Sequence, residues 1–94
     1  MFDIWRDDAG VIHLKGMLDA GSSDRAEKHL DRINANTVLD FGELDHISST
    51  GLGLLIKAQR RLDPLGHRIR IINCNKQIRG VFSITRFDLI FDLD

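Results

Sequence analysis

Three adjacent hydroxyl-bearing residues, Ser48, Ser49 and Thr50, form the part of this sequence best suited to chemistry. They follow an apolar segment and precede a segment with helical periodicity, so we expect them where a strand passes into a helix. Serine and threonine often cap helices at such points, because their side chains accept hydrogen bonds from free amides of the first turn. Three hydroxyls exceed what one cap requires, and Gly51 and Gly53 leave the backbone open to close approach by another molecule. Capping and covalent modification are therefore both open interpretations.

Phosphorylation is the modification that suits a hydroxyl at the start of a helix. A phosphate carries about −1.5 to −2 charges. The positive end of the helix dipole favours such a charge by about 0.3–1 kcal/mol, so the modified fold should survive. The same charge would repel an acidic or apolar partner. A site that tolerates the phosphate while its partner does not would act as a switch.

Other chemistries lack the residues that they need. The glycine pair has no third glycine in dinucleotide-binding spacing, and no Gly-Lys-Ser/Thr phosphate-binding sequence occurs. A nucleophile pair of Ser49 and His46 has no evident third group to orient the imidazole. The histidines lack metal-ligand spacing, and we expect them at the surface or half-buried: His13, His29, His46 and His67. We therefore predict that the chain is not an enzyme and holds no metal or cofactor.

Length, charge and hydropathy restrict the remaining functions. The 94 residues predict one domain spanning residues 1–94, and 43% hydrophobic with 29% charged residues suits a soluble globular protein. Thirteen basic residues stand against 14 acidic ones, so the basic excess of nucleic-acid binders is missing. Without a signal-like N-terminus or a membrane-length apolar run, we expect a cytoplasmic protein that does not insert into a membrane. The single cysteine, Cys74, excludes an internal disulfide and suits a small buried side chain.

The first part of the chain predicts a β-hairpin and a helix. Residues 2–6 and 11–15 are half-apolar runs on either side of a glycine-containing turn, and Gly16 is expected to end the second strand. Residues 17–21 then form a loop. Asp24 stands three residues before a glutamate, an arrangement that resembles a capping box. Apolar residues at helical spacing follow it: Ala26, Leu30 and Ile33.

The rest of the chain alternates between strands and helices. The expected elements are a strand over 37–41, a helix through 52–62, a strand over 69–74, a helix capped by Asn75, and a final strand or tail over 89–91. Asp63-Pro64 should stop the first of these helices, because the residue before proline avoids the α region. Strands that alternate with helices after a hairpin indicate an α/β domain with a mostly parallel sheet.

With these elements placed, the sequence resembles the STAS domain of bacterial anti-sigma factor antagonists. That family has an apolar strand followed by an Asp-Ser-(Ser/Thr)-Gly-(Leu/Ile)-Gly turn into a helix, and residues 38–41 and 47–53 are similar to it. Residues 14–19 resemble the family's Gly-Glu-Leu-Asp loop, while 66–73 and 78–82 match the remaining pattern. The resemblance covers nearly the whole chain. It implies a single small STAS domain whose sheet is covered by helices mainly on one face.

The resemblance also implies partner switching. The unphosphorylated antagonist binds a serine kinase that is also the anti-sigma factor, and so frees the sigma factor. That kinase then phosphorylates and disables the antagonist with ATP, and a metal-dependent serine phosphatase restores it. Ser49 occupies the phosphoacceptor position, with Ser48 and Thr50 as alternatives. The implied partner-binding residues are Asp19, Ser48, Ser49, Thr50, Gly51, Leu52 and Gly53.

Two departures from the family pattern leave other functions open. Ser48 replaces the usual Asp before the acceptor, which removes a negative charge and adds a second hydroxyl, and Met17 replaces the usual Glu. One alternative is a non-enzymatic STAS subunit of an ABC-type lipid-transport ATPase, although that branch usually carries an Asp-Thr-Gly-Gly-like turn. Another is a constitutive binder, or a subunit of a larger sensory complex, that has lost the phosphorylation switch.

Overall fold

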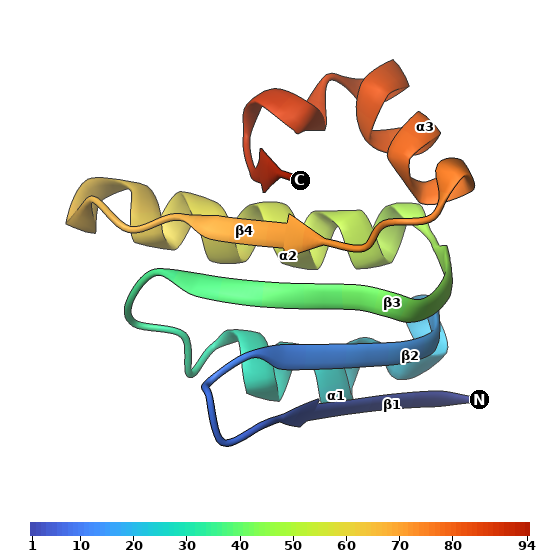
Figure 1. The fold of residues 1–94 in the computed structure, drawn as a ribbon, viewed down its shortest axis with the longest axis horizontal. Coiled ribbons are helices and arrows are strands. Elements are labelled where there is room, and N and C mark those ends of the chain that lie inside the picture. The colour runs from blue at the N-terminus through green and yellow to red at the C-terminus, as the bar shows by residue number, and fades with distance from the viewer.

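A five-stranded sheet in the order β1-β2-β3-β4-β5 runs through the molecule (Figure 1). The computed structural model describes residues 1–94. The strands are β1 (Phe2–Arg6), β2 (Ile12–Leu18), β3 (Thr37–Ile47), β4 (Ile69–Ile72) and β5 (Asp92–Leu93). The helices are α1 (Ser23–Leu30), α2 (Ser49–Leu62) and α3 (Lys76–Thr85), with 3₁₀ turns at Ala20–Ser22, Asp63–Leu65 and Phe87–Leu89. Only β1 and β2 pair antiparallel, so the predicted α/β fold with an opening hairpin and a mostly parallel sheet is confirmed.

The helices cover one face of the sheet and leave the other open. Figure 1 shows α1 and α2 behind the strands, while α3 lies beyond β4 near the C-terminus. Side chains alternate accordingly along β2. Ile12 and Leu14 are buried, whereas His13 and Lys15, which alternate with them, are not. The buried face contributes to a core of 20 hydrophobic residues. The one-sided covering implied by the resemblance is thus confirmed.

The strand β2 continues past Gly16, where the sequence predicted its end. Gly16 has φ of +89°, a left-handed conformation that glycine adopts without strain. A Cβ at this position would collide with the carbonyl of Met1, whose oxygen accepts a hydrogen bond from Met17 N at 3.3 Å. The glycine therefore accommodates an irregularity inside the strand, and pairing with β3 continues to Leu18 and Ile47.

The start of α1 also differs from the prediction. The capping box is formed one turn earlier by Asp19 and Ser22, at the 3₁₀ turn, and Asp24 lies inside the first turn of α1. The helix ends at Leu30, so Ile33 is buried after the helix and not on it. The predicted spacing correctly places Ala26 and Leu30 on the helix. The capping box, however, is made by Asp19 and Ser22 in the preceding loop and not by Asp24.

Later boundaries follow the predicted signals more closely. The helix α2 ends at Leu62, directly before Asp63-Pro64, and Gly66 completes the turn in the left-handed conformation. The predicted reason for this end is wrong, because Asp63 keeps α-region angles (φ −53°, ψ −49°) and the chain continues as a 3₁₀ turn to Leu65. Asn75 caps α3, because its side chain accepts a hydrogen bond from Ile78 N at 2.8 Å. The C-terminal tail returns to the sheet as β5 after Phe91 packs edge-on against Phe82. None of the helices is long and apolar enough to span a membrane.

Candidate functional site

Ser48 caps the helix that carries the hydroxyl cluster. Its backbone is extended, with φ of −92° and ψ of 172°, and its Oγ accepts a hydrogen bond from Gly51 N at 3.2 Å. Its own amide donates to Leu18 O at 2.9 Å, which ties the start of α2 to the end of β2. The Ser48 hydroxyl is therefore engaged in the fold. An Asp at this position would serve equally well as a cap, so Ser48 keeps the architecture while removing a charge.

Ser49 and Thr50 have the opposite character. Both residues are exposed, and neither hydroxyl forms a hydrogen bond within the protein. Ser49 is the first residue of α2, so its side chain stands at the positive end of a 14-residue helix. The backbone amides of Ser49 and Thr50 have no carbonyl partner either. Of the three hydroxyls predicted as candidates, the fold uses one and leaves two available to solvent.

The two glycines of the motif answer different needs. Gly51 is buried, and a Cβ there would lie 2.6 Å from Leu18 O and 2.8 Å from Leu18 Cγ. Gly53 is exposed, and a Cβ there would meet nothing within 4 Å. Gly51 is thus required for the close packing of α2 on the end of β2. Gly53 is not required by packing inside the chain.

Asp19 lies directly after β2 and organises the loop beside the hydroxyl cluster. Its Oδ1 accepts hydrogen bonds from Gly21 N at 3.0 Å and Ser22 N at 3.3 Å, and its amide donates to Ser22 Oγ. Since Leu18 O accepts a hydrogen bond from the amide of Ser48, the Asp19 loop and the start of α2 lie at the same end of the sheet. The structure therefore brings the predicted partner-binding residues together on two adjoining segments.

A hollow at the same end of the sheet, with a lining that is half hydrophobic, was not predicted from the sequence. It measures about 210 Å³ and is lined by Met1, Phe2, Met17, Asp19, Gly21 and Ser22. Met1 is 92% exposed and Met17 is 44% exposed. Met1 directly precedes β1 and Met17 lies on β2, and the hairpin brings them together, because Met17 N donates a hydrogen bond to Met1 O. No local pattern could have indicated this.

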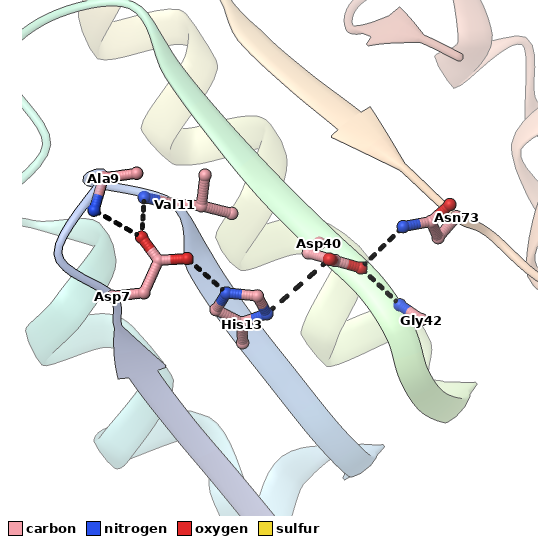
Figure 2. A network of polar contacts seen from close by, with 7 residues as sticks. All are labelled: Asp7, Ala9, Val11, His13, Asp40, Gly42 and Asn73. Carbon is pink, nitrogen blue, oxygen red and sulfur yellow. Dashed lines mark hydrogen bonds and ion pairs between the residues drawn. The ribbon is translucent and has the colours of Figure 1, made fainter.

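A polar network on the open face of the sheet involves His13. Figure 2 shows this imidazole between two carboxylates, with Nε2 2.8 Å from Asp7 Oδ2 and Nδ1 3.6 Å from Asp40 Oδ2. The ring of Trp5 stacks on the imidazole of His13, with 5.3 Å between the ring centroids. The hydrogen bond from His13, together with one from Val11 N, holds the pKa of Asp7 below its ordinary value.

Both carboxylates of this network also hold backbone or amide groups in place. Asp7 accepts from two amides of the hairpin turn, and Asp40 accepts from Gly42 N at 2.8 Å and Asn73 Nδ2 at 3.1 Å (Figure 2). The network therefore joins the hairpin turn, β2, β3 and the segment after β4. We interpret it as structural, because each carboxylate accepts hydrogen bonds that hold the backbone or an amide side chain in place.

The remaining reactive side chains are not assembled into a catalytic group. His46 is exposed on β3, and no hydrogen bond joins it to Ser49. Cys74 is half-buried, and burial raises the pKa of its thiol to about 11, so the unreactive protonated form prevails at neutral pH.

The profile of the STAS domain matches residues 5–94, so the chain belongs to the STAS domain family. Over 85 residues it is 29% identical to BtrV of Bordetella bronchiseptica, a proposed anti-sigma factor antagonist, covering 86% of this chain and 73% of that one. The fold is similar to that of a proposed anti-sigma factor antagonist from Thermotoga maritima, with a TM-score of 0.79, 20% identity and coverage of 99% and 85%. It is also similar to phosphorylated SpoIIAA of Bacillus, a cell-fate determinant, with a TM-score of 0.71, 17% identity and coverage of 100% and 91%.

Proposed function

We propose that this protein is an anti-sigma factor antagonist that is switched off by phosphorylation of Ser49. The observation that carries the proposal is that two adjacent hydroxyls have different roles. The Ser48 hydroxyl caps α2, while the Ser49 hydroxyl is exposed and makes no hydrogen bond within the protein. A kinase can reach Ser49 without unfolding the helix. Thr50 is the alternative acceptor, and modification of Ser48 would remove the cap.

Phosphate on Ser49 is compatible with the folded state. It would stand beside the free amides of Ser49 and Thr50, and the helix N-terminus favours the negative charge by about 0.3–1 kcal/mol. The added charge of about −1.5 to −2 changes the surface that a partner must cover. The modification therefore acts on docking and leaves the fold intact.

The proposed partner in the active state is a serine kinase that is also an anti-sigma factor. The unphosphorylated protein binds this kinase and releases sigma, and a serine phosphatase reverses the modification. The docking surface comprises the Asp19 loop and the first turn of α2: Asp19, Ser48, Ser49, Thr50, Gly51, Leu52 and Gly53. The name of BtrV supports this assignment, as does the occurrence of SpoIIAA in a phosphorylated form. ATP and the phosphatase metal belong to the partners.

Affinity purification from the native host tests the proposal. Tagged wild type and Ser49→Ala should both retain an ATP-binding serine kinase that also binds a sigma factor, and Ser49→Asp should retain much less of it. Ser83→Asp serves as the matched control, because it adds the same charge at an exposed serine of α3 outside this surface, and it should retain the kinase as wild type does. Equal recovery with Ser49→Asp and wild type would refute the switch. Recovery of an ABC-type ATPase without a kinase would point to the lipid-transport alternative instead.

A further inference from the structure

Two arginines and a histidine line a hollow at the other end of β2, far from Ser49. Arg6 ends β1, and His29 and Arg32 lie on and just after the last turn of α1. Together with Ile12 they line a hollow of about 160 Å³. Arg6 and Ile12 are paired across the hairpin, so the hollow lies between the hairpin and the end of α1. At about 3.3 Å per residue, the six steps of β2 separate it from Leu18 by about 20 Å.

The side chains of these two arginines and this histidine have no hydrogen-bond or ion-pair partner in the protein. Most arginines of the chain donate to an acceptor or pair with an acid: Arg25, Arg61, Arg68, Arg70, Arg79 and Arg86. Arg6 and Arg32 do neither, and no hydrogen bond involves the His29 ring. Arg60 on α2 is also unpaired, but it lines no hollow.

The cluster concentrates positive charge where it is not neutralised. Partial burial of His29 and the charges of Arg32, Arg25 and Arg6 lower the pKa of this imidazole, while Asp3 opposes the shift. Asp3 is itself paired with Arg25 at 3.0 Å. The carbonyls at the end of α1 can account for cations on that helix, but they do not account for Arg6, which comes from the sheet. The arrangement is therefore complementary to an anion.

We propose that Arg6, His29 and Arg32 form a binding site for a phosphate group. Guanidinium groups bind phosphate oxygens through two parallel N–H donors, and a pair of them can contact different oxygens of one tetrahedral anion. The hollow has room for a group of that size in place of several water molecules. This site is separate from the proposed phosphoacceptor and does not depend on it.

Titration with inorganic phosphate, followed by NMR at low ionic strength, tests the site. The backbone amide signals of Arg6, His29 and Arg32 and the ring signals of His29 should shift and saturate as phosphate is added, and the pKa of His29 should rise as phosphate binds. Arg6→Gln and Arg32→Gln should each weaken binding about fivefold or more, because each removes charge-assisted hydrogen bonds. Arg60→Gln is the matched control and should leave binding unchanged.

Vesicles distinguish a free phosphate ligand from a lipid headgroup. Wild type and the variants are sedimented with phosphatidylcholine vesicles that contain or lack phosphatidic acid. Binding to the anionic vesicles that Arg6→Gln and Arg32→Gln abolish would identify a lipid phosphate as the source, and phosphate titration without vesicle binding would identify a soluble one. The proposal fails if chloride at matched ionic strength produces the same NMR shifts. It also fails if both arginine variants bind phosphate as wild type does.

Discussion

The two ends of β2 carry different side chains, and each set suits phosphate in a different way. At the Leu18 end, hydroxyls stand at a helix N-terminus and the packing around Gly51 is tight. At the Ile12 end, two arginines and a histidine line an open hollow, and none of its lining residues carries a hydroxyl. In the two proposals, the first end takes phosphate as a covalent group on Ser49, whereas the second binds it through charge-assisted hydrogen bonds. The proposed modification site and the proposed ligand site are then separated by the length of one strand.

Gly51→Ala should have the largest effect on the free energy of unfolding, because it disrupts the packing of α2 on the Leu18 end of β2. The added Cβ lies 2.6 Å from Leu18 O, a backbone atom that cannot move aside cheaply. We expect the free energy of unfolding to fall by about 2–3 kcal/mol in urea denaturation. Gly53→Ala is the control on the same helix, and it should stabilise by about 0.5–1 kcal/mol, because alanine favours helix and the position is open.

Ser48→Ala should have the next largest effect. It removes the side chain that accepts from Gly51 N, and loss of such a cap costs about 1 kcal/mol. Ser48→Asp should retain the free energy of unfolding, since aspartate is an equally good cap. Ser49→Ala should change it by less than about 0.5 kcal/mol, because that hydroxyl bonds to nothing. A larger loss with Ser49→Ala than with Ser48→Ala in chemical denaturation would reverse the roles assigned to the two serines.

The pH dependence of stability should report on the Ile12 end. The folded state lowers the pKa of His29 below the ordinary value of 6.5, so below about pH 6.5 the unfolded chain binds more protons than the folded one. Stability should therefore rise with pH up to about 6.5 and should lose this contribution as pH falls towards the folded pKa. Thermal melts from pH 5 to 7 measure the slope.

His29→Gln should flatten that slope, and saturating phosphate should reduce it as well. The matched change His46→Gln, at an exposed residue of β3, controls for the loss of a histidine elsewhere. If His29→Gln left the slope as steep as in wild type, the cationic surroundings of His29 would not influence its protonation.

Arg32→Gln should have the smallest effect on stability. The guanidinium has no partner in the protein, so the free energy of unfolding should change by less than about 0.5 kcal/mol in urea. A large destabilisation would show that Arg32 supports the fold and is not free to bind a ligand. Comparison with Gly51→Ala sets the tightly packed Leu18 end of β2 against the Ile12 end, which borders the hollow.

Much of the fold could be predicted because its signals are local. Hydrophobic alternation located the hairpin, and the Asp63-Pro64 pair and the Asn75 cap marked helix boundaries that the structure confirms. The errors came from long-range contacts. The strand passes Gly16 because the carbonyl of Met1 lies against it, and β3 runs to Ile47 because β2 pairs along it.

The candidate site divides in the same way. The hydroxyl-glycine turn is contiguous, so its position at a strand-to-helix junction followed from sequence, although the separate roles of Ser48 and Ser49 required coordinates. The cationic hollow is built by Arg6, His29 and Arg32 from distant parts of the chain. A net charge of −1 concealed it, because the acids that balance these residues lie elsewhere.

The position of the phosphate on protein from its native host tests the central claim most directly. Peptide mapping by mass spectrometry should place a single phosphate on Ser49, and the Ser49→Ala protein should carry none while Ser48 and Thr50 remain unmodified. Phosphate on Ser48 or Thr50 with Ser49 unmodified would contradict the account, as would a Ser49→Ala protein that is phosphorylated to the same extent as wild type.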